Sequence, residues 1–136
     1  MIKNLKGTVL QNGLKLGDTS DVGTIDGVTF KPEYWSNAAF AMRTATRAQI
    51  VNWCKANQTS GLTVGTVEQQ QFTNITVQGH TYGIFFPCKQ DRFMGSGPMY
   101  NINISDCTYG LYAEGGTYVS STGYAPQYSI LTGVDW

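Results

Sequence analysis

The sequence has few charged residues and few of the side chains that usually mark a metal or cofactor site. Asp, Glu, Lys and Arg make up 13% of its 136 residues, and nine basic residues balance nine acidic ones. A nucleic-acid-binding protein usually carries a basic surplus that neutralises phosphates, so we predict no nucleic-acid partner. There is one histidine, and the three cysteines match no metal-ligand spacing. The composition therefore points to no cofactor.

Long apolar segments are also missing. No run approaches the roughly 18 residues that a membrane-spanning helix needs. The first residues, MIKNLKGTVLQNG, alternate in character instead of forming the apolar block of a signal peptide. We therefore predict no membrane partner. The chain is instead rich in glycine and aromatic residues, with 16 Gly, eight Tyr and six Phe, a composition typical of β-rich proteins.

One short motif recurs along the chain. NITVQGHTYGIFF (74–86) and NINISDCTYGLYA (101–113) align without a gap at an offset of 27 residues. Each copy has a first half that starts on an apolar residue, at Ile2, Ile25, Phe72 and Met99. Each second half starts on a glycine, at Gly13, Gly61, Gly83 and Gly110. A frayed fifth copy, YSILTG, begins at Tyr128. Such repetition indicates stacked copies of one unit.

The third position of the first half is Asn or Gly in every copy: Asn4, Gly27, Asn74 and Asn101. Both residue types tolerate positive φ, so we expect a sharp bend there between two short strands. We expect the glycine of each second half to mark a second bend. The aliphatic residues then alternate, the period of a strand with one buried face. A unit this short must stack on its own copies to bury that face.

These features predict an all-β fold, a single-stranded parallel β-helix of about four coils, with 1–136 as one domain. The repeats resemble the right-handed β-helices of pectate lyases, polygalacturonase-type glycoside hydrolases and bacteriophage tailspikes. DVGTIDGVTFKPEYW (21–35) is similar to a phrase in large bacterial and phage members of that group. The resemblance implies a right-handed coil. Because the chain starts in mid-repeat and stops as a fifth copy begins, we expect a longer parent protein.

One repeat is interrupted by an insertion at 31–60, hereafter the insert. Its stretch TATRAQIVNWCKANQ (44–58) predicts a helix, with Thr44 or Thr46 as the N-terminal cap. Four side chains share one face of that helix: Ile50, Trp53, Cys54 and Asn57. We expect this helix to pack against the side of the stacked repeats.

The segments after the second-half strands carry five acidic residues: Asp18, Asp21, Glu68, Asp91 and Glu114. Carboxylates on neighbouring coils would lie about 5 Å apart, and those two coils apart about 10 Å. These separations bracket the spacings used in retaining and inverting glycoside hydrolysis. Glu68, Asp91 and Asp21 are the candidates for catalytic acid, base or cation ligand. The structural alternative is that polar turns commonly hold Asp and Glu, and that loops of different length need not superpose.

Other residues of these segments are candidates for substrate binding. Arg92 could orient a sugar carboxylate or pair with Asp91. Tyr34, Trp35 and Tyr112 lie in or beside loops, where flat rings can stack on sugar faces. Packing in the core is the alternative for each ring, and Tyr82 and Tyr109 are interpreted as a structural ladder. The polygalacturonase signatures Asn-Thr-Asp, Asp-Asp, Gly-His-Gly and Arg-Ile-Lys are absent.

The resemblance implies an extracellular or virion-associated protein that acts on polysaccharide as a glycoside hydrolase or a lyase. The alternative belongs to another class, a glycan-binding or purely structural element such as a tailspike shaft or adhesin stalk. If the chain comes from a phage, we expect a homotrimer.

Overall fold

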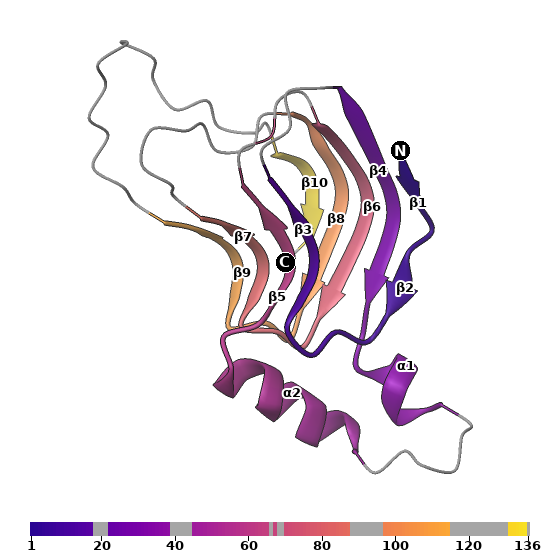
Figure 1. Ribbon diagram of the computed structural model, residues 1–136, viewed down its shortest axis with the longest axis vertical. Helices are drawn as coiled ribbons and strands as arrows, with labels where there is room; N and C mark the ends of the chain where they lie inside the picture. The colour runs from indigo at the N-terminus through magenta and orange to yellow at the C-terminus, as the bar shows by residue number, and fades with distance from the viewer. Residues whose placement is uncertain are drawn as a thin grey trace.

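The computed structural model describes residues 1–17, 22–38, 45–65, 67, 70–87 and 97–114, together with the backbone of 131–135. Within these residues the strands form two sheets, and every strand pair is parallel (Figure 1). Sheet A contains β1 (Ile2–Lys3), β2 (Lys6–Gly7), β4 (Gly23–Phe30), β6 (Gln70–Gln78), β8 (Met99–Ser105) and β10 (Leu131–Asp135). Sheet B contains β3 (Asn12–Leu16), β5 (Ser60–Val64), β7 (Tyr82–Phe86) and β9 (Tyr109–Ala113).

The predicted fold class, a right-handed single-stranded parallel β-helix, is wrong. The strands lie in two separate parallel sheets, and the part of the chain that the structure describes shows no closed solenoid. The sheets follow the orders β1-β4-β6-β8-β10 and β3-β5-β7-β9, with β2 also paired to β4. The chain alternates between them, and the apolar faces of both sheets enclose one core. The repeats predict which residues pair in register. They do not predict a closed coil, because two facing sheets bury the same apolar residues between them.

The alignment of the first four copies is confirmed by the strand register. Ile2 pairs with Ile25, Ile25 with Phe72, and Phe72 with Met99. In sheet B, Leu62 pairs with both Leu14 and Ile84. The positive φ predicted at the third position is confirmed at all four residues: Asn4, Gly27, Asn74 and Asn101. Only Asn4 separates two short strands as predicted, because the other three lie inside β4, β6 and β8.

The predicted start of the fifth copy, Tyr128, is three residues too early. Strand β10 pairs Leu131 with Met99 and Val134 with Ile102. The copy therefore begins at Leu131 and reads LTGVDW, parallel to IDGVTF at Ile25. Glycine, not isoleucine, then occupies the third position of this copy.

The glycines that open the second halves do not make bends. Gly13, Gly61 and Gly83 lie in strands of sheet B, outside the positive-φ region. A Cβ on Gly13 would lie 2.6 Å from the Phe30 ring, and one on Gly61 would lie 2.2 Å from Val77. These glycines are required because an apolar side chain of sheet A reaches each of them, and at Gly13 and Gly83 the carbonyl of the adjacent strand is also too close for a Cβ.

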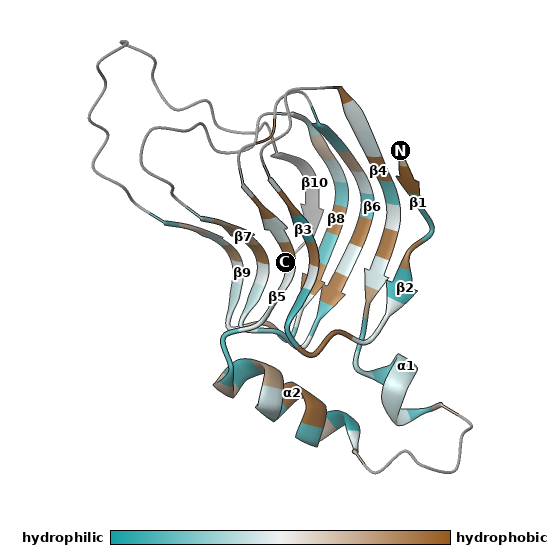
Figure 2. Ribbon diagram, viewed as in Figure 1, coloured by the Kyte–Doolittle hydropathy of each residue, from teal (hydrophilic) through white to brown (hydrophobic). Residues whose placement is uncertain are grey.

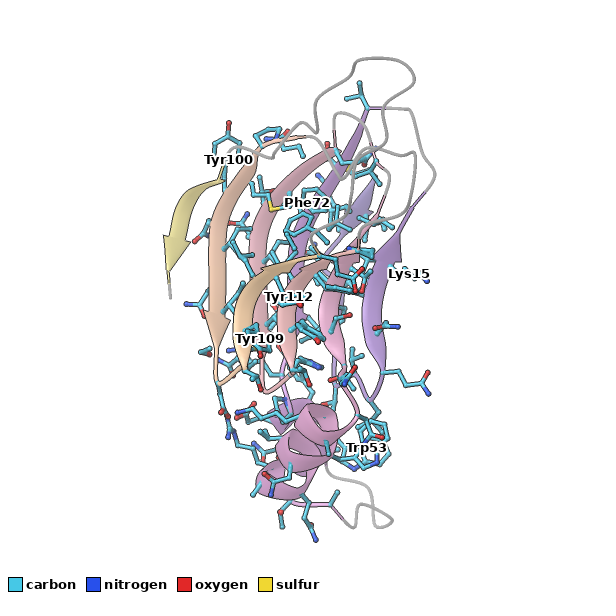
Figure 3. The ribbon with its side chains drawn as sticks, turned by 90° about the vertical axis from the view of Figure 1, so that its left-hand side faces the viewer. Lys15, Trp53, Phe72, Tyr100, Tyr109 and Tyr112 are labelled. Carbon is cyan, nitrogen blue, oxygen red and sulfur yellow. The ribbon has the colours of Figure 1, made fainter. Side chains whose placement is uncertain are left out.

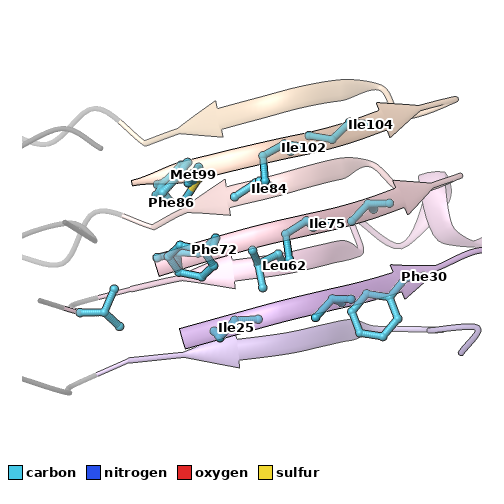
Figure 4. Close-up of a cluster of buried hydrophobic side chains, with 14 residues drawn as sticks. Ile25, Phe30, Leu62, Phe72, Ile75, Ile84, Phe86, Met99, Ile102 and Ile104 are labelled. Atoms are coloured by element: carbon cyan, nitrogen blue, oxygen red, sulfur yellow. The ribbon is translucent and has the colours of Figure 1, made fainter. Parts of the chain in front are cut away.

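The core lies between the two sheets (Figure 4). Its largest fully buried side chains include Phe72, Leu62, Ile75 and Ile84. Burying each such side chain contributes about 1.5–3 kcal/mol to stability. Figure 2 shows the apolar residues alternating along the sheet A strands, as burial of one face requires.

The described residues of the insert contain two helices, α1 (Glu33–Ser36) and α2 (Arg47–Ala56). Thr46 caps α2, and its backbone N–H donates to the Gln49 side chain, 2.8 Å away, to complete a capping box. The predicted apolar face needs correction, because Ile50, Val51 and Cys54 are buried whereas Trp53 is exposed. Figure 1 shows α2 crossing the ends of the strands. None of the helices in the described ranges is long and apolar enough to cross a membrane.

Candidate functional site

All three predicted catalytic residues, Asp21, Glu68 and Asp91, lie outside the described residues. The predicted substrate-binding residue Arg92 falls there too, so the geometry of all four stays a prediction. The strands that precede these residues do share one register. Leu16 pairs with Val64, and Phe86 pairs with Ala113, so the four following segments begin at the same edge of sheet B. Glu114 is exposed at this edge, and its N–H donates to the Phe86 carbonyl at 3.0 Å.

The structure separates the predicted aromatic binding residues into two groups. Tyr34 and Trp35 are exposed on α1, and the Trp35 N–H donates to Thr8 Oγ1 at 2.9 Å. Tyr112 is exposed on β9 of sheet B, at the other side of the molecule from α1 (Figure 1). The three side chains therefore do not form one site.

Tyr112 belongs to a group of four rings on β7 and β9, here called the aromatic platform. Its members are Tyr82, Phe85, Tyr109 and Tyr112. The rings of Tyr82 and Tyr109 stack with centroids 5.6 Å apart and an interplanar angle of 16°. Tyr112 lies 5.0 Å from Tyr82, 5.9 Å from Phe85 and 5.2 Å from Tyr109. Each ring thus contacts at least two others at distances typical of favourable aromatic pairs.

The platform is open to solvent. Tyr109 is 47% exposed and Tyr112 is 36% exposed, and Figure 3 shows both on the face turned to the viewer. The backbone register explains why the rings meet. Tyr82 pairs with Tyr109, and Phe85 pairs with Tyr112, so each ring has another on the adjacent strand. Neighbouring strands are about 4.8 Å apart, which matches the ring spacing.

Polar side chains continue both rows of the platform across sheet B. The Tyr82 row continues to Ser60 and Asn12, and the Phe85 row continues to Thr63 and Lys15. Ser60 Oγ donates to Asn12 Oδ1 at 2.8 Å and shares a 2.6 Å hydrogen bond with Thr63 Oγ1. Ser60 and Thr63 are buried, whereas Asn12 and Lys15 are exposed. This sheet face therefore passes from an aromatic half to a hydrogen-bonded polar half.

Of the four platform rings, only Tyr112 was predicted from the sequence as a binding residue. Strict alternation would put Tyr82 and Phe85 on opposite faces, because they are three residues apart. The structure breaks the alternation at Gly83, since Gly83 and Ile84 are both buried. As a result the ring centroids of Tyr82 and Phe85 lie 5.1 Å apart. The sequence signal for this contact is the pair of aromatic residues three positions apart in both YGIF (82–85) and YGLY (109–112).

The remaining titratable groups give no metal centre in the described ranges, which hold no cluster of three or more His, Cys, Asp or Glu side chains suited to an ion. Cys54 and Cys107 are free thiols there, and burial raises the pKa of each. No family model matches the chain, and no curated protein or solved structure matches it either. The platform is the feature of the described residues most suited to bind a ligand.

Proposed function

We propose that this protein binds polysaccharide through the aromatic platform. The observation that carries the proposal is the contact of four rings on an exposed sheet face. An exposed tyrosine ring does not contribute the stability that its burial would give. A contiguous exposed apolar patch usually marks a binding surface. Tyrosine combines a flat apolar ring with a hydroxyl, so it can stack on the C–H face of a sugar and hydrogen-bond its hydroxyls.

The layout of the platform favours an extended ligand. Its rings come from two strands about 4.8 Å apart, and both rows continue over Ser60–Asn12 and Thr63–Lys15. A linear glycan lying across the strands would contact rings at one end and exposed polar groups at the other. Extracellular or virion-borne placement remains part of the proposal, as the resemblance to polysaccharide-acting proteins implies.

The test is binding to a panel of capsular, pectic and other acidic and neutral polysaccharides, by affinity electrophoresis and then titration calorimetry. Tyr109→Ala and Tyr112→Ala should each weaken binding about tenfold, which corresponds to about 1.4 kcal/mol of lost stacking. Tyr112→Phe, which keeps the ring, should retain most of the affinity. The matched control is Tyr100→Ala, because Tyr100 is 43% exposed but lies on β8 of sheet A.

Two results would refute the proposal. One is the absence of binding to every polysaccharide in the panel. The other is equal loss of binding in the Tyr112 and Tyr100 variants, which would mean that the platform has no special role. Mass spectrometry of the polysaccharide after incubation tests the separate prediction of hydrolysis or elimination by Glu68, Asp91 and Asp21. Saturated products indicate a hydrolase, and products lighter by one water indicate a lyase.

A further inference from the structure

The insert rests on three turns that join sheet A to sheet B at one end of the molecule. The first turn follows β2, where Thr8 Oγ1 donates to the Lys31 carbonyl at 2.7 Å and the Cys54 thiol donates to the Val9 carbonyl at 3.5 Å. The second is the β6–β7 turn, 79–81. The third is the β8–β9 turn, where Asp106 accepts from Lys55 Nζ at 2.9 Å. The insert is thus attached to the sheets through neighbouring turns.

The β6–β7 turn is the closest of these attachments. Gly79 has positive φ, and a Cβ there would lie 2.8 Å from Pro32 and 2.9 Å from Val51. Thr81 Oγ1 donates to the carbonyls of Cys54 and Lys55, at 3.1 and 3.0 Å. The turn therefore caps the C-terminal carbonyls of α2 and leaves no space between itself and the insert.

His80 lies in the centre of this contact and is only 2% exposed. Its Nδ1 is 2.9 Å from Thr59 Oγ1. Thr59 Oγ1 donates its own proton to the Cys54 carbonyl at 3.1 Å. The hydroxyl must then accept from His80, which assigns the proton of a neutral imidazole to Nδ1. The single histidine of the chain is therefore buried, uncharged and hydrogen-bonded to the insert.

Charged groups surround this contact and are already paired. On α2, Arg47 and Lys55 both bind Asp106, each at 2.9 Å, and Arg47 also binds Glu33 of α1. Cys107 follows Asp106 in the β8–β9 turn, where burial raises its thiol pKa. Asp106 is thus already paired with two cations, Arg47 and Lys55. A protonated His80 would add a third positive charge at this end of the sheets.

We propose that α2 is released by acid: protonation of His80 detaches α2 from the β6–β7 turn while the two sheets stay folded. The sheets can persist because the buried residues of their shared core are apolar, from Ile25 to Ile104. The contacts of His80, Asp106 and Glu33 described above instead join the insert to itself and to the turns. This inference is independent of polysaccharide binding.

The pKa of His80 supports the direction of the change. Burial lowers this pKa to about 4 from the ordinary 6.5. A depressed pKa favours the neutral, docked form, whose advantage is complete above pH 6.5 and is lost as the pH falls toward 4. The opening equilibrium of α2 should therefore rise about 20-fold between pH 7 and pH 5, and about 100-fold by pH 4. Burial opposes ionisation of Glu33, but its hydrogen bond to Arg47 still lowers its pKa, and the hydrogen bond from Lys55 lowers the pKa of Asp106.

The experiment is hydrogen–deuterium exchange of the full chain from pH 7 to pH 4, read by mass spectrometry and corrected for intrinsic exchange. Peptides from α2 should lose protection by the factors above, while peptides from β6 keep theirs. In His80→Asn, which keeps a polar group and cannot take up a proton, α2 protection should not change between pH 7 and pH 5. Asp106→Asn is the matched control, which should weaken protection at all pH values but leave the titration between pH 7 and pH 5.

Three results would overturn the proposal. They are loss of α2 and β6 protection in parallel, no loss in α2 down to pH 4, or a His80→Asn variant that titrates like the parent. If His80→Asn does not fold, the imidazole signals of the parent can be titrated by NMR, without ambiguity because the chain has one histidine. An apparent pKa near 6.5 for the folded protein would also overturn it, and one near 4 supports it.

Discussion

Replacing Gly61 by alanine should destabilise the protein, and replacing Val77 by alanine in the same chain should then add little to that loss. A Cβ on Gly61 would lie 2.2 and 2.7 Å from the two methyl carbons of Val77 and 3.0 Å from its Cβ. No other atom is as close to that position, so the clash belongs to one side chain. Both residues are buried, Val77 completely.

The magnitudes follow from packing. Overpacking by one methyl in a dense core costs about 1–3 kcal/mol, which is our expectation for Gly61→Ala. Val77→Ala removes two buried methyl groups, and the transfer and cavity costs together come to about 2 kcal/mol. In the double variant the new methyl occupies the space that the valine methyls left. We therefore expect a total loss of about 2 kcal/mol instead of about 4, a coupling energy of about 2 kcal/mol.

Urea unfolding followed by circular dichroism measures all four members of this cycle, with equal m values as the condition for comparison. Gly7→Ala is the control, since a Cβ on Gly7 would meet nothing within 4 Å. It should change stability by less than about 0.5 kcal/mol. Additive losses in the double variant would refute the packing argument, because the two positions would then not be in contact.

Three further predictions concern hydrogen bonds of the repeats and of the insert. Thr46→Ala should cost about 1 kcal/mol, and Thr46→Ser little, because only the first variant loses the capping box. Asn74→Ala should cost about 1–2 kcal/mol, because alanine loses the 2.8 Å bond to Asp26 and is strained at positive φ. Asn74→Gly should cost less, because glycine loses the same bond but accepts the positive φ. Asp106→Asn should cost less than about 1 kcal/mol, and 1 M salt should reduce its effect, since its ion pairs are partly exposed. Urea unfolding checks each of these losses.

The periodic features of this fold were predictable from sequence, and the reason is local. Asn and Gly at the third position accept positive φ, and a repeated third position implies stacked bends, which the structure has at Asn4, Gly27, Asn74 and Asn101. Closure of the coil is not local. Whether two strands of one repeat join a single sheet or two depends on side chains that meet across the core, and the motif is the same in both cases.

The glycines of the second halves show the same limit. Glycine is common in turns, so Gly13 was predicted as a bend residue, yet its reason here is the close approach of the Gly61 carbonyl and the Phe30 ring. Contacts of this kind come from tertiary packing and leave no periodic signal. The candidate acids present a different difficulty. They lie in connecting segments of unequal length, so the residues of one segment cannot be aligned with those of the next repeat.

The aromatic platform lies between these extremes. Its ladder partners, Tyr82 with Tyr109 and Phe85 with Tyr112, follow from the offset of 27 residues. The contact between Tyr82 and Phe85 does not, because it depends on a local break in the alternation at Gly83.

The side-chain hydrogen bonds along the bends all run in one direction, from donor to acceptor. Asn101 donates its amide to Asn74 at 2.6 Å, and Asn74 donates in turn to Asp26 at 2.8 Å. An amide can receive on its oxygen and donate from its nitrogen, whereas an ionised carboxylate can only receive. Asp26 also accepts from Thr73, which together with Asn74 lowers the pKa of its carboxyl group. The row is therefore a one-way chain with a terminus at Asp26. A duplicated repeat inserted between Asn74 and Asn101 would extend it, so growth of this architecture by tandem duplication is permitted on one side of Asp26 and interrupted on the other.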